Sequence, residues 1–280
     1  MFFHRPKVMG ILNVTPDSFW DGSRVKTSEE IRQRIRKMID EGADIIDIGG
    51  CSTRPGAIAV TPEEEYERLQ PALEALRETD ERITVSIDTF SSYVARRCVE
   101  EWNVNIVNDI SGGDLDPEMW PLIAHLSVPY VLTHYGNRHP LGLKEKAVEE
   151  GGDILIDDVT SSEDITAKVI KELSMKVSEL HLLGVNDVII DPGFGFGKTT
   201  EDNLRMLNKL EEICRMGYPV LAGISRKSMI SKTLGTDAEN SLTGTIALNT
   251  VALMKGAHIL RVHDVREAVE TVKMTEALKN

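Results

Sequence analysis

The chain has 280 residues, a formal net charge of -13 at pH 7 and 41% hydrophobic residues. This length suits one large domain, because α/β barrels often reach about 250 residues as a single unit. The acidic balance argues against nucleic acid and anionic membranes as partners, since both require a basic face. The N-terminus lacks the apolar stretch of a signal peptide, no run approaches a membrane span of roughly 20 residues, and the 3 cysteines show no metal-binding spacing. We therefore expect a cytoplasmic protein.

Short runs rich in Val and Ile alternate with longer segments of helical period along the whole chain. The predicted strands are, in order, Val8–Val14, Asp44–Ile48, Ile83–Asp88, Asn105–Asp109, Tyr130–His134, Asp187–Asp191, Val220–Ile224 and Ile259–His263. Near-continuous apolar strands that alternate with helices indicate a parallel sheet covered by helices. Eight such units favour a (β/α)8 TIM barrel over a doubly wound sheet, which more often has about five or six strands.

The segments between the strands carry apolar residues at helical spacing. Ile31, Ile35 and Met38 follow this pattern, as do Val265 and Ala268 near the end of the chain. The polar stretch 136–164 breaks the rhythm and is expected to be an insertion over one mouth of the barrel. No linker divides the sequence, so we predict one domain over residues 1–280.

Polar side chains stand at the end of nearly every predicted strand, and in a TIM barrel these ends form the active site. They are Asn13, Thr53, Arg54, Asp88, Asn108, Asp109, His134, Asp191, Ser225, Lys227, Arg261 and His263. Asp88, Asn108 and Asp191 suit the amino-amide edge of a planar heterocycle. Lys227, Arg261 and His263 suit a phosphate or diphosphate. A helix that begins after Ser225 would offer backbone N–H groups to an anion, and Asn13 can help to bind Mg²⁺ carried by a diphosphate.

Seven sequence blocks occur in an order and at spacings that resemble the dihydropteroate synthase family. They are Asn13-Val14-Thr15-Pro16-Asp17-Ser18-Phe19, Asp47-Ile48-Gly49-Gly50 with Ser52-Thr53-Arg54-Pro55-Gly56, Ser86-Ile87-Asp88-Thr89, Asn108-Asp109-Ile110, Asp191 through Lys198, Ser225-Arg226-Lys227-Ser228, and Arg261 through Val265. The resemblance implies a homodimeric (β/α)8 barrel. It also implies a transferase that condenses 6-hydroxymethyl-7,8-dihydropterin diphosphate with p-aminobenzoate, giving 7,8-dihydropteroate and diphosphate.

The resemblance also implies roles for individual residues. The residues implied to bind the pterin are Asp88, Asn108, Asp191, Lys227, Tyr135 and Phe196. Those implied to bind the diphosphate are Asn13, Arg54, Arg261 and His263, with Mg²⁺ as cofactor at Asn13. Those implied to bind the aminobenzoate are Thr53, Pro55, Phe196 and Ser225. Asp21, in a first mobile loop, joins Asp88, Asp191 and Lys227 as a catalytic position. The segments 15–22 and 51–57 are expected to form a lid that excludes water. Cys51, Trp20 and Tyr135 depart from the residues frequent in the family.

Two other functions fit parts of this pattern. A methyltetrahydrofolate-dependent methyltransferase domain would share the pterin contacts but would not need the blocks at 52–56 and 225–228. A catalytically silent paralogue would bind pterin without turnover. Diphosphate release that depends on the amine separates both from a synthase.

Overall fold

The computed structural model describes residues 5–14, 24–51, 60–136 and 164–279, and it confirms the eight predicted strands. Each strand begins within one residue of its predicted start. The bounds are β1 Lys7–Asn13, β2 Ile45–Gly49, β3 Thr84–Asp88, β4 Ile106–Asp109, β5 Tyr130–Thr133, β6 Val188–Asp191, β7 Leu221–Ala222 and β8 Ile259–Val262. The predicted insertion and both lid segments lie almost wholly outside the described residues.

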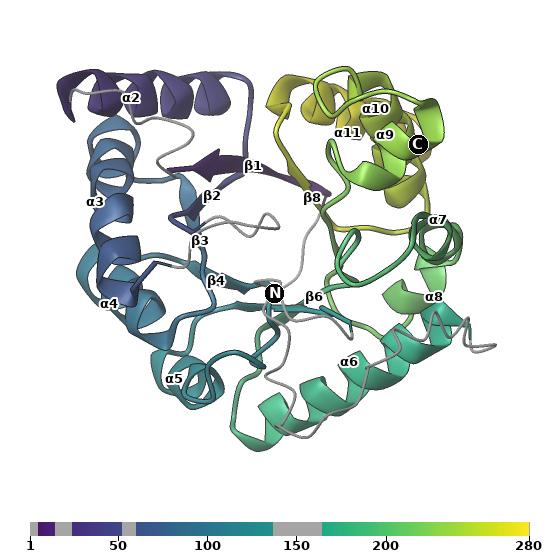
Figure 1. The fold of residues 1–280 in the computed structure, drawn as a ribbon, viewed down its shortest axis with the longest axis horizontal. Coiled ribbons are helices and arrows are strands. Elements are labelled where there is room, and N and C mark those ends of the chain that lie inside the picture. The colour runs from purple at the N-terminus through teal and green to yellow at the C-terminus, as the bar shows by residue number, and fades with distance from the viewer. Residues whose placement is uncertain (1–4, 15–23, 52–59, 137–163, 280) are drawn as a thin grey trace, which may run out of the picture.

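The strands form one parallel sheet that curves into a nearly closed barrel, as Figure 1 shows. Their order is β6-β5-β4-β3-β2-β1-β8-β7, so paired strands are consecutive in sequence except for β1 and β8. Between β6 and β7, the described residues make a single bridge, Ile190 to Val220, in which Ile190 N donates to Pro219 O at 2.9 Å. This seam closes a single-domain (β/α)8 TIM barrel.

Strand β7 is shorter than predicted, with two residues in place of the expected Val220–Ile224. The chain leaves the sheet after Ala222 and turns, and Lys227 N donates to Ile224 O at 3.1 Å. Arg226 within this turn has a φ of 55°, which no strand residue adopts. An apolar sequence pattern does not reveal where such a turn begins.

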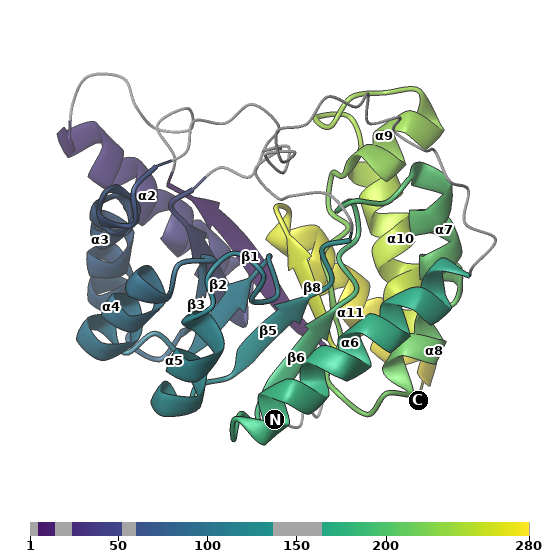
Figure 2. The same ribbon diagram turned by 60° about the horizontal axis from the view of Figure 1, so that its bottom comes forward.

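Helices form the outer ring around the sheet (Figures 1 and 2). Their bounds are α2 Arg24–Asp40, α3 Pro62–Thr79, α4 Ser92–Trp102, α5 Met119–Leu126, α6 Ile165–Leu182, α7 Thr200–Asn208, α8 Leu210–Cys214, α9 Ser228–Leu234, α10 Leu242–Met254 and α11 Val265–Lys279. As the periodicity predicts, Ile31, Ile35 and Met38 are buried on α2, and Val265 and Ala268 on α11. No helix in the described part of the chain is long and apolar enough to cross a membrane.

Toward the amino ends of the strands, the barrel interior is filled by one apolar layer, to which every strand except β3 contributes a residue. Its members are Met9, Ile45, Ile106, Val131, Ile189, Leu221 and Ile259. Since side chains alternate between the two faces of a strand, the next inward position lies two residues farther on. Those positions include Asp47, Asn108, Asp191 and Arg261. The fold thus places a polar layer directly above the apolar one, toward the carboxyl ends of the strands.

Candidate active site

The polar layer of the barrel is held together by strand register and hydrogen bonds. Asp88 of β3 lies opposite Gly49 of β2 and Asn108 of β4. Asn108 is 2% exposed, and its Nδ2 donates to Asp47 Oδ2 at 3.0 Å. Three neighbouring strands therefore bring the predicted pair Asp88 and Asn108 side by side, beside a fully buried carboxylate at Asp47.

Arg261 of β8 reaches into this layer and contacts two carboxylates. Its Nε donates to Asp47 Oδ2 at 2.6 Å, and its Nη2 donates to Asp88 Oδ2. Both Asp88 and the guanidinium are 17% exposed as side chains. The sequence assigned Arg261 to a diphosphate, whereas the structure shows it linking two carboxylates inside the barrel.

Burial shifts the proton equilibria of the charged groups at this end of the barrel. It raises the pKa of Asp88 to about 7, although the charges of Arg261 and Lys227 oppose the shift. Burial likewise raises the pKa of Asp191. The charge of Lys227 and a hydrogen bond from Gly193 N at 2.7 Å oppose this rise. The pKa of Lys227 falls to about 8 because its ammonium is buried. At neutral pH the layer can therefore both donate and accept protons.

The loop that follows β6 forms a wall beside Lys227. The ring of Phe196 lies 5.1 Å from the ring of Tyr135, centroid to centroid, and 4.4 Å from Lys227 Nζ. Lys227 Nζ also donates to Phe194 O. At Gly193, where φ is 71°, an added Cβ would lie 1.9 Å from a backbone oxygen, so only glycine fits. The structure thus brings together three residues assigned to the pterin or the aminobenzoate.

Lys198 fixes the conformation of this loop. Its Nζ donates to the backbone oxygens of His134, Gly193 and Phe196 at 3.1, 2.9 and 3.0 Å. Burial lowers the pKa of the ammonium to about 7. Sequence reasoning gave Lys198 no role, because the acceptors are backbone atoms and leave no trace in the pattern of residues.

Ser225 and His263 meet at the boundary between β7 and β8. Ser225 Oγ accepts from His263 N at 3.2 Å and lies 3.3 Å from His263 Nδ1. Burial, together with the charge of Arg261, lowers the pKa of His263 to about 4. The imidazole is therefore neutral at pH 7 and can donate one hydrogen bond to an anion.

Asn13 ends β1 opposite Gly49, and its Oδ1 would lie 3.4 Å from a Cβ built at that glycine. The same Cβ would lie 3.5 Å from the Cβ of Asp88. One amide oxygen at the rim suits Mg²⁺, which is commonly held by one or two protein oxygens and completed by phosphate oxygens and water. Among the described residues, no cluster of three or more His, Cys, Asp or Glu side chains is arranged to hold a metal ion. A magnesium site at Asn13 stays a prediction.

Several predicted site residues lie outside the described residues, namely Asp21, Thr53, Arg54 and Pro55. Asp47, in contrast, was missed by sequence reasoning as a site residue, although it contacts both Asn108 and Arg261. Its signal was available: it is the single charged residue in an otherwise apolar strand, two residues after the inward-facing Ile45.

Comparisons with known proteins identify the family of this chain. Residues 9–263 match the family described as "Pterin binding enzyme". A dihydropteroate synthase of Clostridium beijerinckii is 40% identical over 277 residues, which cover 98% of this chain and 94% of the relative. The chain belongs to the dihydropteroate synthase family.

Solved structures of this family superpose on nearly the whole chain. A Clostridium difficile dihydropteroate synthase, solved in the presence of pteroic acid, matches with a TM-score of 0.86 and 35% identity, covering 99% of both chains. A Xanthomonas albilineans dihydropteroate synthase with 4-aminobenzoic acid matches with a TM-score of 0.84 and 37% identity, covering 99% of this chain and 94% of the other. Family membership thus extends to the full barrel, and the protein is a transferase of this family.

Proposed function

We propose that this protein condenses 6-hydroxymethyl-7,8-dihydropterin diphosphate with p-aminobenzoate. The amine nitrogen forms a bond to the exocyclic methylene of the pterin, the bond from that carbon to the diphosphate oxygen breaks, and the nitrogen loses a proton. Diphosphate leaves with the bonding electron pair, and 7,8-dihydropteroate is the product. The observation that carries the proposal is the polar layer in which Asp88, Asn108, Asp191 and Lys227 converge on one mouth of the barrel, beside the cation Arg261.

The pterin would be bound by the carboxyl and amide groups of this layer. Asp88 and Asp191 offer acceptors to its amino and ring N–H groups, and Asn108 offers both a donor and an acceptor. Buried carboxylates also stabilise positive charge that develops on the pterin as diphosphate departs. Lys227 would contact the ring system, with Tyr135 and Phe196 packed beside it.

Pterin binding would release part of the Arg261 side chain. Arg261 Nη2 donates to Asp88, the same carboxylate that the pterin needs, so the pterin must replace this contact. Arg261 Nε keeps its bond to Asp47 at 2.6 Å, which leaves the guanidinium anchored while Nη2 turns toward the diphosphate. This exchange reconciles the observed ion pairs with the predicted role of Arg261 at the leaving group.

The remaining diphosphate contacts would come from His263, Arg54 and Asn13. When bound with the diphosphate, Mg²⁺ supplies positive charge that stabilises the leaving group. Asn13 Oδ1 would hold the ion, His263 would donate a hydrogen bond, and Arg54 would add a cation.

The aminobenzoate would lie against Phe196 and Ser225, with Thr53 and Pro55 completing its slot. Asp21 would act from the first lid loop. Alignment of the amine with the methylene is the main task of this slot, because positioning supplies much of the rate enhancement in such a displacement.

Diphosphate release tests the proposal. We expect release from the dihydropterin diphosphate that requires Mg²⁺ and p-aminobenzoate. Asp191→Asn should abolish it, Thr53→Ala should mainly raise the KM for the amine, and Asp114→Asn, at a carboxylate 63% exposed, is the control. Pterin binding without turnover would indicate the silent paralogue, and methyl transfer to a corrinoid would indicate the methyltransferase.

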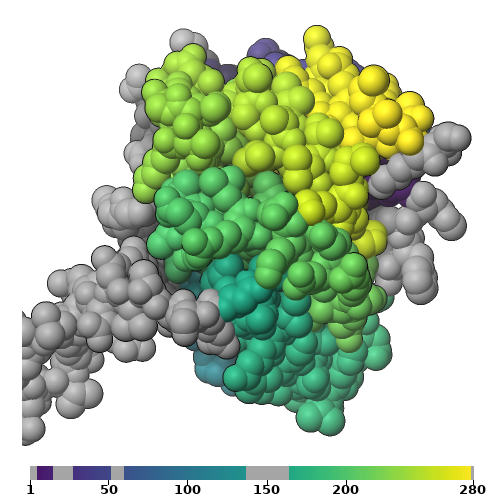
Figure 3. Space-filling view, turned by 90° about the vertical axis from the view of Figure 1, so that its right-hand side faces the viewer, coloured from purple at the N-terminus to yellow at the C-terminus, as the bar shows by residue number. Residues whose placement is uncertain are grey.

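We also propose that the protein forms a homodimer through α10 and its neighbour α11. The solvent-facing positions of α10 include Ala247, Val251 and Met254, and α11 adds Met274 and Leu278, which are 66% and 71% exposed. Figure 3 shows the side of the molecule on which these helices lie. An apolar exposed helix face is typical of an interface between subunits. Sedimentation equilibrium of the wild type and of Val251→Glu tests it, and a wild-type monomer would contradict it.

A cytoplasmic location is proposed on different grounds. Cys98 and Cys214 carry free thiols in the structure, as a reducing compartment would keep them.

A further inference from the structure

Backbone pairing does not set the position of the turn after β7 relative to the end of β8. The two strands pair only at Leu221 with Ile259 and at Ala222 with Leu260 among the described residues. Ser225 and Lys227 lie beyond this ladder, as does His263 on the other side. Their relative positions must therefore depend on side-chain contacts.

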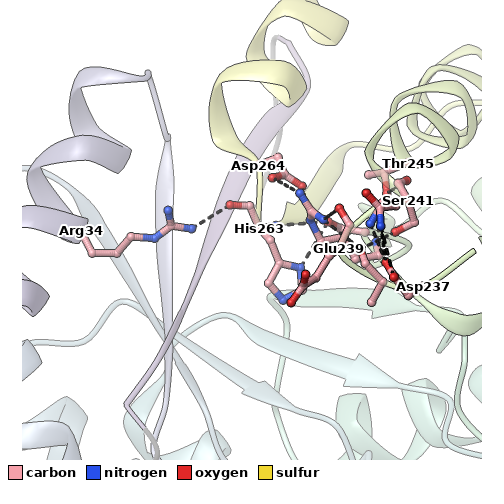
Figure 4. Close-up of polar contacts among 11 residues, drawn as sticks. Arg34, Asp237, Glu239, Ser241, Thr245, His263 and Asp264 are labelled. Atoms are coloured by element: carbon pink, nitrogen blue, oxygen red, sulfur yellow. Dashed lines mark hydrogen bonds and ion pairs between the residues drawn. The ribbon is translucent and has the colours of Figure 1, made fainter. Parts of the chain in front are cut away.

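Arg226, between Ser225 and Lys227, provides the most extensive of these contacts. Its Nε donates to Asp264 Oδ2 at 2.8 Å and its Nη2 to Asp264 Oδ1 at 2.9 Å (Figure 4). The pair joins positions 38 residues apart in sequence. Two parallel hydrogen bonds fix orientation as well as distance, which a single contact from a lysine cannot do.

The other half of the guanidinium holds a second loop in place. Arg226 Nη1 donates to Ala238 O at 2.8 Å and to Glu239 O at 2.6 Å. Arg226 N donates to Thr245 Oγ1 at 3.1 Å, on α10 (Figure 4). One side chain thus connects the turn after β7 with the end of β8 and with the loop before α10.

The conformation of Arg226 indicates a specific demand at this position. It is one of three non-glycine residues with positive φ in the described part of the chain, at 55°. A residue with a Cβ is disfavoured in this left-handed conformation. A glycine would avoid this cost, so the side chain offers something that a glycine cannot.

Asp264 links the contact with Arg226 to His263, a residue assigned to the diphosphate. It directly follows His263, whose backbone oxygen accepts from Arg34 Nη2 at 2.8 Å on the opposite side (Figure 4). The side chains of Arg226 and Asp264 are 23% and 19% exposed, so solvent screens this pair less than a surface ion pair.

We propose that Arg226 and Asp264 are positioning residues that hold the turn after β7 against the end of β8. The pair keeps Ser225 and Lys227 in register with Arg261 and His263, so that the amine, pterin and diphosphate sites face one another. Neither residue contacts substrate. The inference rests on the proposed function, because the geometry it protects is that of the condensation.

A double-mutant cycle on the full-length protein tests the pair. We expect Arg226→Gly and Asp264→Asn each to lower kcat/KM for the dihydropterin diphosphate at least about tenfold, since small displacements of positioned groups cost large factors in rate. The double variant should lose no more kcat/KM than the less active of the two single variants. Once either partner is gone, the second substitution has no contact between Arg226 and Asp264 left to remove. Activity within twofold of the wild type in either folded single variant, or losses that multiply in the double variant, would overturn the proposal.

A matched ion pair at the opposite end of the barrel is the control. Arg5 donates to both oxygens of Asp44, as Arg226 does to Asp264, but lies at the amino end of the strands. Arg5→Gly should leave kcat/KM within about twofold of the wild type. Methylguanidinium should restore part of the activity of Arg226→Gly and none to Asp264→Asn, a difference that a purely structural role would not produce.

Two further measurements keep the outcome clear. If Arg226→Gly fails to fold, Arg226→Lys retains the charge without the two parallel bonds, and wild-type activity in that variant would overturn the proposal. If the wild type itself releases no diphosphate when amine is present, the proposed function fails instead of the positioning role.

Discussion

Asp47 holds the base of the site through one carboxylate oxygen. This residue is fully buried, and its Oδ2 accepts from Arg261 Nε at 2.6 Å and from Asn108 Nδ2 at 3.0 Å. Asp47→Ala leaves both donors without this acceptor, and Arg261 keeps only the carboxylate of Asp88 among the two it contacts. The site would lose the anchor from which the guanidinium turns.

The free energy of unfolding should fall in a graded way. Removing one partner of a buried ion pair costs about 3 to 5 kcal/mol. Because Arg261 keeps its contact to Asp88, we expect the lower end of this range, about 3 kcal/mol. An unpaired Asn108 amide adds about 1 kcal/mol, so Asp47→Ala should cost about 4 kcal/mol. Asp47→Asn keeps the shape and an acceptor oxygen but loses the charge, which should cost about 1 to 2 kcal/mol.

Urea-induced unfolding at pH 7 measures these differences, with Asp40→Ala on the exposed end of α2 as the control. Diphosphate release should fall in the same order, since Asn108 and Arg261 are both displaced. An alanine variant within about 1 kcal/mol of the wild type, or an asparagine variant as unstable as the alanine one, would refute the reasoning.

Three further predictions follow from the packing around the site. Gly193→Ala should destabilise far more than Gly184→Ala, in which an added Cβ meets nothing within 4 Å and costs only the strain of a positive φ, about 1 to 2 kcal/mol; equal shifts in melting temperature would contradict this. Burial raises the pKa of Glu65 to about 7, so the folded state binds more protons than the unfolded state between about pH 4.5 and 7, and the wild type loses stability as the pH rises through this window. In urea unfolding, the free energy of unfolding of Glu65→Gln relative to that of the wild type should therefore rise by about 3 kcal/mol from pH 4.5 to pH 8. If this difference did not change with pH, the raised pKa of Glu65 would be contradicted. Lys198→Met should raise the KM for p-aminobenzoate several-fold, because Phe196 loses the hydrogen bond from Lys198 to its backbone oxygen. An unchanged KM would show that the loop after β6 keeps its conformation without Lys198.

The barrel and most of its polar layer could be predicted from the sequence because both depend on local periodicity. Each Val- and Ile-rich run is short enough to be a strand and is followed by an amphipathic helix. Asp88, Asn108 and Asp191 stand at strand ends, and strand ends meet at one mouth in any such barrel. The sequence therefore places these residues without any knowledge of their contacts.

The contacts within the site were beyond the reach of periodicity. Arg226 lies within a block identified from the sequence, yet nothing in that block shows that its guanidinium meets Asp264 after a gap of 38 residues. Lys198 binds backbone oxygens, whose positions depend on how two loops fold together. Arg261 was assigned to the leaving group from its charge, whereas its partners depend on how the barrel brings β2, β3 and β8 together.

The single bridge between β6 and β7 has a consequence for hydrogen exchange and for ligand binding. In a ring joined by ladders on every other side, thermal opening concentrates where the fewest backbone bonds must break, which is between Ile190 and Val220. Asp191 lies on the β6 side of this seam and Lys227 on the β7 side. A rigid planar ligand that binds both residues would connect the two sides, so the backbone amides of β6 and β7 would exchange more slowly in the complex.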